Sequence, residues 1–172
     1  MIATERVQRL LAPGYATDLE ARTFEDLRAM HTECAQAELA LSYYRRLAQA
    51  RIEILEAESA RRARGGSVAD LVADLPRILS AESGRSSVAT TRGAPAADPP
   101  TIELHWPDHR ENLVVDTTLA RLPVLSPEEL AGTTDALRRF EREVSDLRAQ
   151  LHVVIDAIDH VLADRRVAGT AG

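Results

Sequence analysis

Five polar residues of one stretch fall at a spacing that places them on a single side of a helix. The stretch ELALSYYRRLAQARIE holds them at offsets of 0, 4, 7, 11 and 15, namely Glu38, Ser42, Arg45, Gln49 and Glu53. Because an α-helix turns about 100° per residue, side chains at these offsets form one narrow stripe. Carboxylate, hydroxyl, guanidinium and amide groups together could hold a polar ligand by hydrogen bonds.

A second stripe repeats this pattern 103 residues further along the chain, in the stretch EREVSDLRAQLHVVID. The same offsets are occupied by Glu141, Ser145, Arg148, His152 and Asp156. Patterns that support an isolated helix place glutamate four residues before arginine or lysine, and neither stripe contains such a pair. Two copies in register therefore predict a binding site, whereas one copy alone would indicate a solvated helix surface.

The residue types in the stripes suit a guanine nucleotide. Arginine presents a fork of donors to a phosphate group or to the O6 and N7 atoms of guanine. A carboxylate can accept hydrogen bonds from guanine N1–H and from the 2-amino group. Because this set occurs twice, we expect a guanine nucleotide that itself has two-fold symmetry.

Two long helices are predicted to carry the stripes. Residues 23–64 contain no proline or internal glycine, begin with the capping pattern of Thr23 and Asp26, and end at a pair of glycines. A second long helix is predicted for residues 126–166, because Ser126 precedes a proline and two glutamates.

Apolar residues recur at alternating spacings of three and four in both predicted helices, which is the heptad pattern of a coiled coil. In the first helix they are Leu27, Met30, Cys34, Ala37, Leu41, Tyr44, Ala48 and Leu55, with Arg51 interrupting the series. In the second they are Leu137, Phe140, Val144, Leu147, Leu151, Val154, Ile158 and Val161. We expect an antiparallel hairpin, although the long connection would also permit a parallel pair.

The heptad register places both stripes beside this apolar seam. With Ala37 and Phe140 at position d, each stripe occupies positions e, b, e, b and f. In an antiparallel coiled coil the e positions of the two helices face each other. Both stripes are therefore expected to line one side of the hairpin, related by a pseudo-two-fold axis.

The predicted fold is all-α, a single domain over residues 1–172, with a long antiparallel coiled-coil hairpin and short flanking helices. The stretches TERVQRLLAP and SVADLVADLPRILSAE are amphipathic, and Pro76 would kink the second. Residues 83–101 are small, polar and rich in proline, and are predicted to be a flexible linker. The stretch TIELHWPDHRENLVVDTTLARLPVL suggests a short strand and a few hydrophobic anchors.

Composition excludes several classes of protein. Aromatic residues make up only 3% of the chain, which disfavours a β-sandwich or a base-stacking surface. The net charge of -6 disfavours direct binding to nucleic acid. The lone Cys34 is expected to be a small core residue, and the absence of a long apolar run predicts no membrane span. We expect a cytoplasmic protein.

The duplicated pattern resembles the E-x3-S-x2-R-x3-Q-x3-D signature of the RsiG family, actinobacterial anti-sigma factors that use cyclic di-GMP. The resemblance implies a coiled-coil hairpin that binds a dimer of cyclic di-GMP, two nucleotides per chain, through the ten stripe residues. It also implies that the liganded form sequesters a WhiG-type sigma factor and represses sporulation genes. Glu53 stands where the pattern has aspartate, and His152 where it has glutamine, a change that adds a group able to titrate near neutral pH.

Two other classes of function compete with this hypothesis. A coiled-coil adaptor would use the stripes to bind a protein partner and no nucleotide. An enzyme is disfavoured, because no nucleophile motif or phosphate loop is present and an exposed coiled-coil flank would not desolvate Glu38, Glu53 or Asp156. We therefore expect no catalytic residue.

A metal site is the remaining alternative that the sequence raises. The stretch HWPDHRE and the residues around it supply candidate ligands, namely His105, Asp108, His109 and Glu111. They lie in an irregular segment and lack the spacing of two histidines on one helix turn. We expect a polar loop and no metal.

Overall fold

The computed structural model describes residues 5–67, 76, 104–106, 108–115 and 117–170. Among these residues all regular secondary structure is helical, and no strand is present. The elements in chain order are α1 (Glu5–Leu10), η1 (Leu19–Ala21), α2 (Phe24–Ala63), α4 (Asn112–Val115), η3 (Thr117–Val124) and α5 (Pro127–Thr170). The predicted all-α fold is confirmed. The predicted short strand is absent from the described part of its stretch, where residues 104–106 have no regular structure.

The chain divides into two compact units, and each unit contains a part of both long helices. Unit 1 consists of Met1–Ser42, Pro99–His109 and Val144–Gly172, and unit 2 of Tyr43–Asp98 and Arg110–Glu143. The predicted linker at 83–101, and nearly all of the amphipathic stretch around Pro76, lie outside the described residues. The single-domain organisation stays a prediction.

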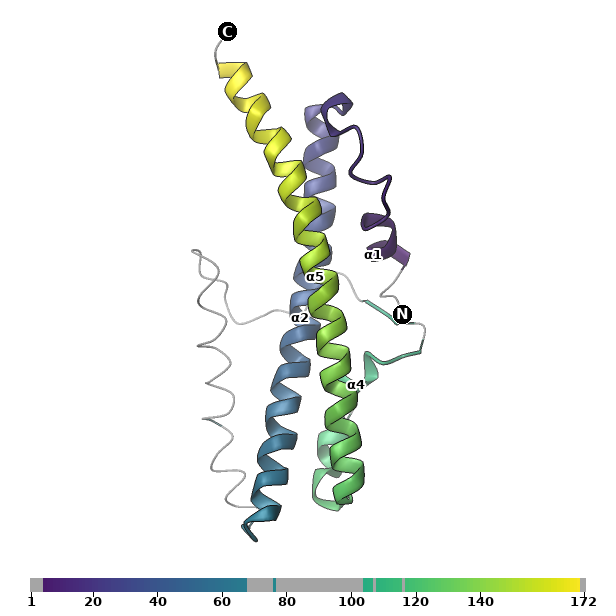
Figure 1. The fold of residues 1–172 in the computed structure, drawn as a ribbon, viewed down its shortest axis with the longest axis vertical. Helices are drawn as coiled ribbons and strands as arrows, with labels where there is room; N and C mark the ends of the chain where they lie inside the picture. The colour runs from purple at the N-terminus through teal and green to yellow at the C-terminus, as the bar shows by residue number, and fades with distance from the viewer. Residues whose placement is uncertain (1–4, 68–75, 77–103, 107, 116, 171–172) are drawn as a thin grey trace. The chain divides into compact units, whose positions relative to one another are not determined.

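In unit 1 the first part of α2 packs antiparallel to the second part of α5 (Figure 1). His31 Nε2 lies 3.3 Å from Asp159, and Glu38 Oε1 lies 2.8 Å from Arg148 Nη2. Later positions of α2 therefore contact earlier positions of α5. The buried apolar residues of this unit include Val7, Leu10, Leu27, Cys34, Leu41, Leu104, Trp106, Val144, Leu151 and Ile158.

Unit 1 also holds α1 against the first part of α2. Arg9 forms an ion pair with Glu33, and the Tyr15 hydroxyl donates to Glu33 Oε2 at 3.3 Å. Beside them Cys34 is a free, fully buried thiol, as predicted, and burial raises its pKa. These contacts join the N-terminal segment to the hairpin.

Unit 2 repeats the antiparallel order. Arg45 Nε lies 3.1 Å from Glu141 Oε1, and Arg138 Nη2 lies 2.9 Å from Glu56 Oε1. The buried apolar residues here are Tyr44, Ala48, Leu55, Val114, Leu122, Leu125, Leu130, Leu137 and Phe140. Because both units show the same order, the helical hairpin is confirmed and the parallel alternative is excluded.

The heptad seam matches the pattern of burial over most of both helices. Every predicted seam residue of α2 is buried except Met30, which is half-buried. In α5 the seam residues Leu147, Val154 and Val161 are only half-buried, and near the end of the helix the burial shifts by one position to Leu162. A straight helix with 3.6 residues per turn drifts against a repeat of 3.5, which accounts for this shift.

Reciprocal capping boxes start both long helices. Asp26 N–H donates to Thr23 Oγ1 at 3.0 Å, and Thr23 N–H donates to Asp26 Oδ2 at 3.3 Å. At the start of α5, Glu129 N–H donates to Ser126 Oγ at 3.1 Å, and Ser126 N–H donates to Glu129 Oε2 at 2.8 Å. Each box satisfies two backbone donors that an unprotected helix start would leave to water.

Ser126→Ala is expected to lower the free energy of unfolding by about 1 kcal/mol, because the substitution leaves the N–H of Glu129 without its acceptor. Urea denaturation of both proteins measures this difference. Ser59→Ala is the matched control, since Ser59 is an exposed serine inside α2, where alanine favours the helix slightly. Equal stability of Ser126→Ala and wild type would contradict the proposed cap.

Candidate functional site

Four stripe residues meet at one carboxylate in unit 1. Glu38 Oε1 accepts hydrogen bonds from Ser42 Oγ at 2.7 Å and from Arg148 Nη2 at 2.8 Å. His152 Nε2 lies 3.4 Å from the same oxygen. We call these residues the Glu38 cluster; two of them come from α2 and two from α5.

Three stripe residues meet at a carboxylate in unit 2. Glu141 Oε1 accepts a hydrogen bond from Arg45 Nε at 3.1 Å and another from Gln49 Nε2 at 3.0 Å. We call these residues the Glu141 cluster. The glutamate comes from α5, and both of its donors come from α2.

The two clusters are the same interaction with the helices exchanged. In each, the first residue of one stripe is contacted by the third and fourth residues of the other stripe. Glu38 and Arg148 both occupy position e, as do Arg45 and Glu141. The expected contact between e positions is therefore found separately in each unit.

The environment of Glu38 differs from the expected exposed flank. Its side chain retains 21% of its exposure, and the side chain of Arg148 retains 22%. Burial raises the pKa of Glu38, but hydrogen bonds from Ser42 and Arg148, with the charges of Arg148 and His152, lower it by more. The net pKa is lowered, so Glu38 stays ionised. The expectation that the flank provides no desolvation is wrong for this residue, because the neighbouring helix covers part of it.

Three stripe residues lie outside the two clusters. Ser145 is half-buried on α5, and Glu53 is half-buried on α2. Asp156 is exposed on α5 and forms no hydrogen bond or ion pair with the described residues. The structure thus brings together seven of the ten predicted residues, each within its own unit.

Sequence reasoning missed that the stripes pair across the helices. Residues four positions apart within one stripe carry no opposite charges, so the pairing is not visible within either helix alone. The signal lay in the e positions, because each stripe has glutamate at its first e position and arginine at its second. In an antiparallel pair, the first e position of one helix meets the second of the other. The free protein therefore uses its own arginines to neutralise its own glutamates.

Neither a metal site nor a membrane span is found in the described part of the chain. No group of three or more histidine, cysteine, aspartate or glutamate side chains there could hold a metal ion. Among the candidate ligands, His105, Asp108 and His109 are exposed, whereas Glu111 is buried. No helix among the same residues combines the length and apolar character needed to cross a membrane.

These observations define a helical-hairpin protein whose two polar stripes pair across the helices. Residues 13–79 match the model of a family described as RsiG-like, a segment that contains all of α2 and the first stripe. The match supports the resemblance to the RsiG family that the stripes indicate, and this family suggests a regulatory anti-sigma role. A comparison with curated proteins gave no match.

Proposed function

We propose that this protein is a cytoplasmic anti-sigma factor that binds a pair of cyclic di-GMP molecules through its two stripes. In its liganded form it sequesters a WhiG-type sigma factor and represses the transcription of sporulation genes. The RsiG-like match supports the anti-sigma role. The observation that supports this ligand is that the Glu38 and Glu141 clusters have the same contacts with the roles of α2 and α5 exchanged. A ligand with two-fold symmetry needs such matching groups on both helices.

The clusters have the groups that guanine recognition requires. An ionised carboxylate accepts from guanine N1–H and from the 2-amino group, and an arginine donates to O6 and N7. Arg45 retains 35% of its exposure and Glu141 retains 20%, so their ion pair is partly solvated. Such pairs stabilise a protein by about 0–1 kcal/mol. Exchanging them for contacts with a nucleotide therefore costs little.

Nucleotide binding can be coupled to sigma binding through the helices. Each cluster takes groups from both α2 and α5, so a bound nucleotide fixes the spacing of the two helices at that level. A sigma factor that prefers this spacing binds the liganded form more tightly. By linkage, the sigma factor must then tighten nucleotide binding by the same factor.

Calorimetric titration with cyclic di-GMP tests the proposal. Wild-type protein is expected to saturate at two nucleotides per chain, and Arg45→Ala/Arg148→Ala is expected to lose binding because both guanidinium groups are removed. Cyclic di-AMP is the matched ligand control, since adenine lacks O6, N1–H and the 2-amino group. It is expected not to bind.

A flat titration would be repeated with a WhiG-type sigma factor present, because linkage permits binding that is measurable only in the complex. No nucleotide binding there would overturn the proposal. Capture of the sigma factor without any nucleotide would then support the coiled-coil adaptor.

A further inference from the structure

The ten stripe residues carry a net negative charge, which opposes the binding of a phosphodiester ligand. They include four carboxylates and two guanidinium groups, a net charge of -2 with His152 neutral. Each cyclic dinucleotide adds a negative charge on both of its phosphodiester groups. In addition, Arg45 and Arg148 are already paired with glutamates. Cations from outside the stripes would offset this repulsion at the phosphates.

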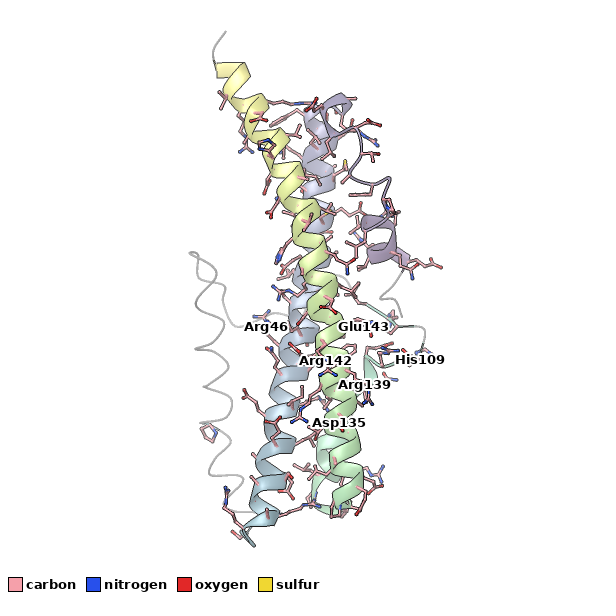
Figure 2. All side chains as sticks on the ribbon, in the orientation of Figure 1. Arg46, His109, Asp135, Arg139, Arg142 and Glu143 are labelled. Carbon is pink, nitrogen blue, oxygen red and sulfur yellow. The ribbon has the colours of Figure 1, made fainter. Side chains whose placement is uncertain are left out.

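Two arginines outside the stripes flank the Glu141 cluster. Arg46 follows Arg45 on α2, and Arg142 follows Glu141 on α5, so each is the chain neighbour of one member of a cross-helix ion pair. All four residues belong to unit 2. Arg46 and Glu143 point to opposite sides of the helix pair (Figure 2).

Both arginines retain unused donors. Among the described residues, neither Arg46 nor Arg142 forms a hydrogen bond or ion pair. Arg142 is exposed, whereas the Nε of Arg46 is buried and has no acceptor. A buried donor without an acceptor is costly and rare in folded proteins, and a phosphate oxygen is a strong acceptor for it.

The Glu38 cluster lacks such flanking cations. The residue after Glu38 is Leu39, which is exposed, and the residue after Arg148 is Ala149. With its two flanking arginines, the Glu141 cluster has an excess of two positive charges. The Glu38 cluster with its flanking residues is neutral when His152 is neutral. The two clusters therefore have the same contacts but differ in the charge around them.

We infer that Arg46 and Arg142 bind phosphodiester groups of the nucleotide held at the Glu141 cluster. This inference rests on the proposed function and deepens it, because it separates two tasks. The stripe residues read guanine on both helices. Arg46 and Arg142 neutralise the phosphates, and they do so in unit 2.

Titrations with cyclic di-GMP at low and high salt test this assignment on wild type, Arg46→Ala, Arg142→Ala and the double variant. Each single substitution is expected to raise the Kd about tenfold, since a charge-assisted hydrogen bond is lost. The double variant is also expected to respond less to salt, because fewer charge contacts remain to be screened. Arg46→Lys/Arg142→Lys, which keeps the charge, is expected to recover part of the affinity.

Arg64→Ala is the matched control. Arg64 is exposed at the end of the same unit's α2 helix region and lies 18 residues after Arg46. That is about 27 Å along a helix, well beyond the screening length of about 10 Å at 0.1 M salt. This variant loses the same charge, and its Kd is expected to equal that of wild type.

The outcomes separate this inference from the proposed function. If wild type binds and Arg46→Ala/Arg142→Ala binds equally well, the phosphate role is overturned and the nucleotide site stands. If wild type does not bind, with or without the sigma factor, both are overturned. Circular dichroism confirms that the variants remain helical. Should the double variant unfold, Arg142→Gln decides the question, since Arg142 is exposed and its truncation leaves the core intact.

Discussion

Replacing Glu58 by glutamine is expected to lower the free energy of unfolding by about 3 kcal/mol at pH 7. Glu58 is only 1% exposed, and it accepts hydrogen bonds from Arg61 Nε at 2.7 Å and from Arg62 Nε at 2.6 Å. Arg62 in turn donates to the carbonyl oxygens of Leu122 at 2.7 Å and Leu125 at 2.5 Å. Glu58 therefore orients the side chain that joins the end of α2 to η3 and to Leu125, just before α5, within unit 2.

The loss of stability caused by Glu58→Gln is expected to become smaller as the pH falls. Hydrogen bonds from Arg61 lower the pKa of Glu58 most; burial opposes them, Arg62 adds to them, and the pKa falls from 4.5 to about 2. Because the folded pKa is below the unfolded one, the stabilisation is complete above about pH 4.5 and is lost as the pH falls through about 2. At pH 3, roughly half of it should remain.

Urea denaturation at pH 7 and pH 3 measures this change. The difference between wild type and Glu58→Gln should shrink from about 3 to about 1.5 kcal/mol as the pH falls. Glu56→Gln is the control, since its partner Arg138 is 47% exposed and water screens their ion pair. An equal loss for Glu58→Gln at both pH values would show that its charge is not the cause.

Glu58 also illustrates what the sequence could not reveal. In the same register as Tyr44 and Arg51 it occupies position d of the next heptad, where a coiled coil normally has an apolar residue. A carboxylate at that position is tolerated because two arginines of the next helical turn bond to it and one of them reaches the carbonyl oxygens at Leu122 and Leu125. Those carbonyls are distant in sequence, and no helical periodicity points to them.

The long helices could be predicted because several signals agree on each of them. Caps, apolar spacing and the absence of proline gave bounds of 23–64 and 126–166, against Phe24–Ala63 and Pro127–Thr170 in the structure. The segment between them gives no such agreement. Trp106 is 1% exposed in a stretch without regular structure, so it is an anchor set by tertiary packing and not by periodicity.

The stripes could be found from spacing, but their state in the free protein could not. Spacing shows that five side chains share a face. It does not show the register of the partner helix, which determines that Arg45 meets Glu141 and that Arg148 meets Glu38. In this register each stripe arginine is paired with a glutamate, so little positive charge is left for a ligand. Neutralising the phosphates is the task inferred above for Arg46 and Arg142.

Exchanging the charges of the Arg45–Glu141 pair should weaken nucleotide binding strongly while sparing the fold. Arg45→Glu alone places two carboxylates together across the helices and is expected to destabilise unit 2. Arg45→Glu/Glu141→Arg restores an ion pair between α2 and α5, so its stability should return close to that of wild type. The carboxylate and the guanidinium then lie on the wrong helices for guanine. We expect the Kd for cyclic di-GMP to rise at least about 100-fold.

A matched exchange lies on the other edge of the same unit. Arg110 forms an ion pair with Glu143, whose position g in the heptad lies on the opposite side of the apolar seam from the e positions of the stripes. Arg110→Glu/Glu143→Arg should bind cyclic di-GMP within about twofold of wild type, provided that thermal unfolding shows a native fold. If the exchange at Arg45 and Glu141 also kept its affinity, the pair would serve only to hold the helices together. Binding would then depend on charge alone, because the arrangement of donors and acceptors that distinguishes guanine would have been reversed without effect.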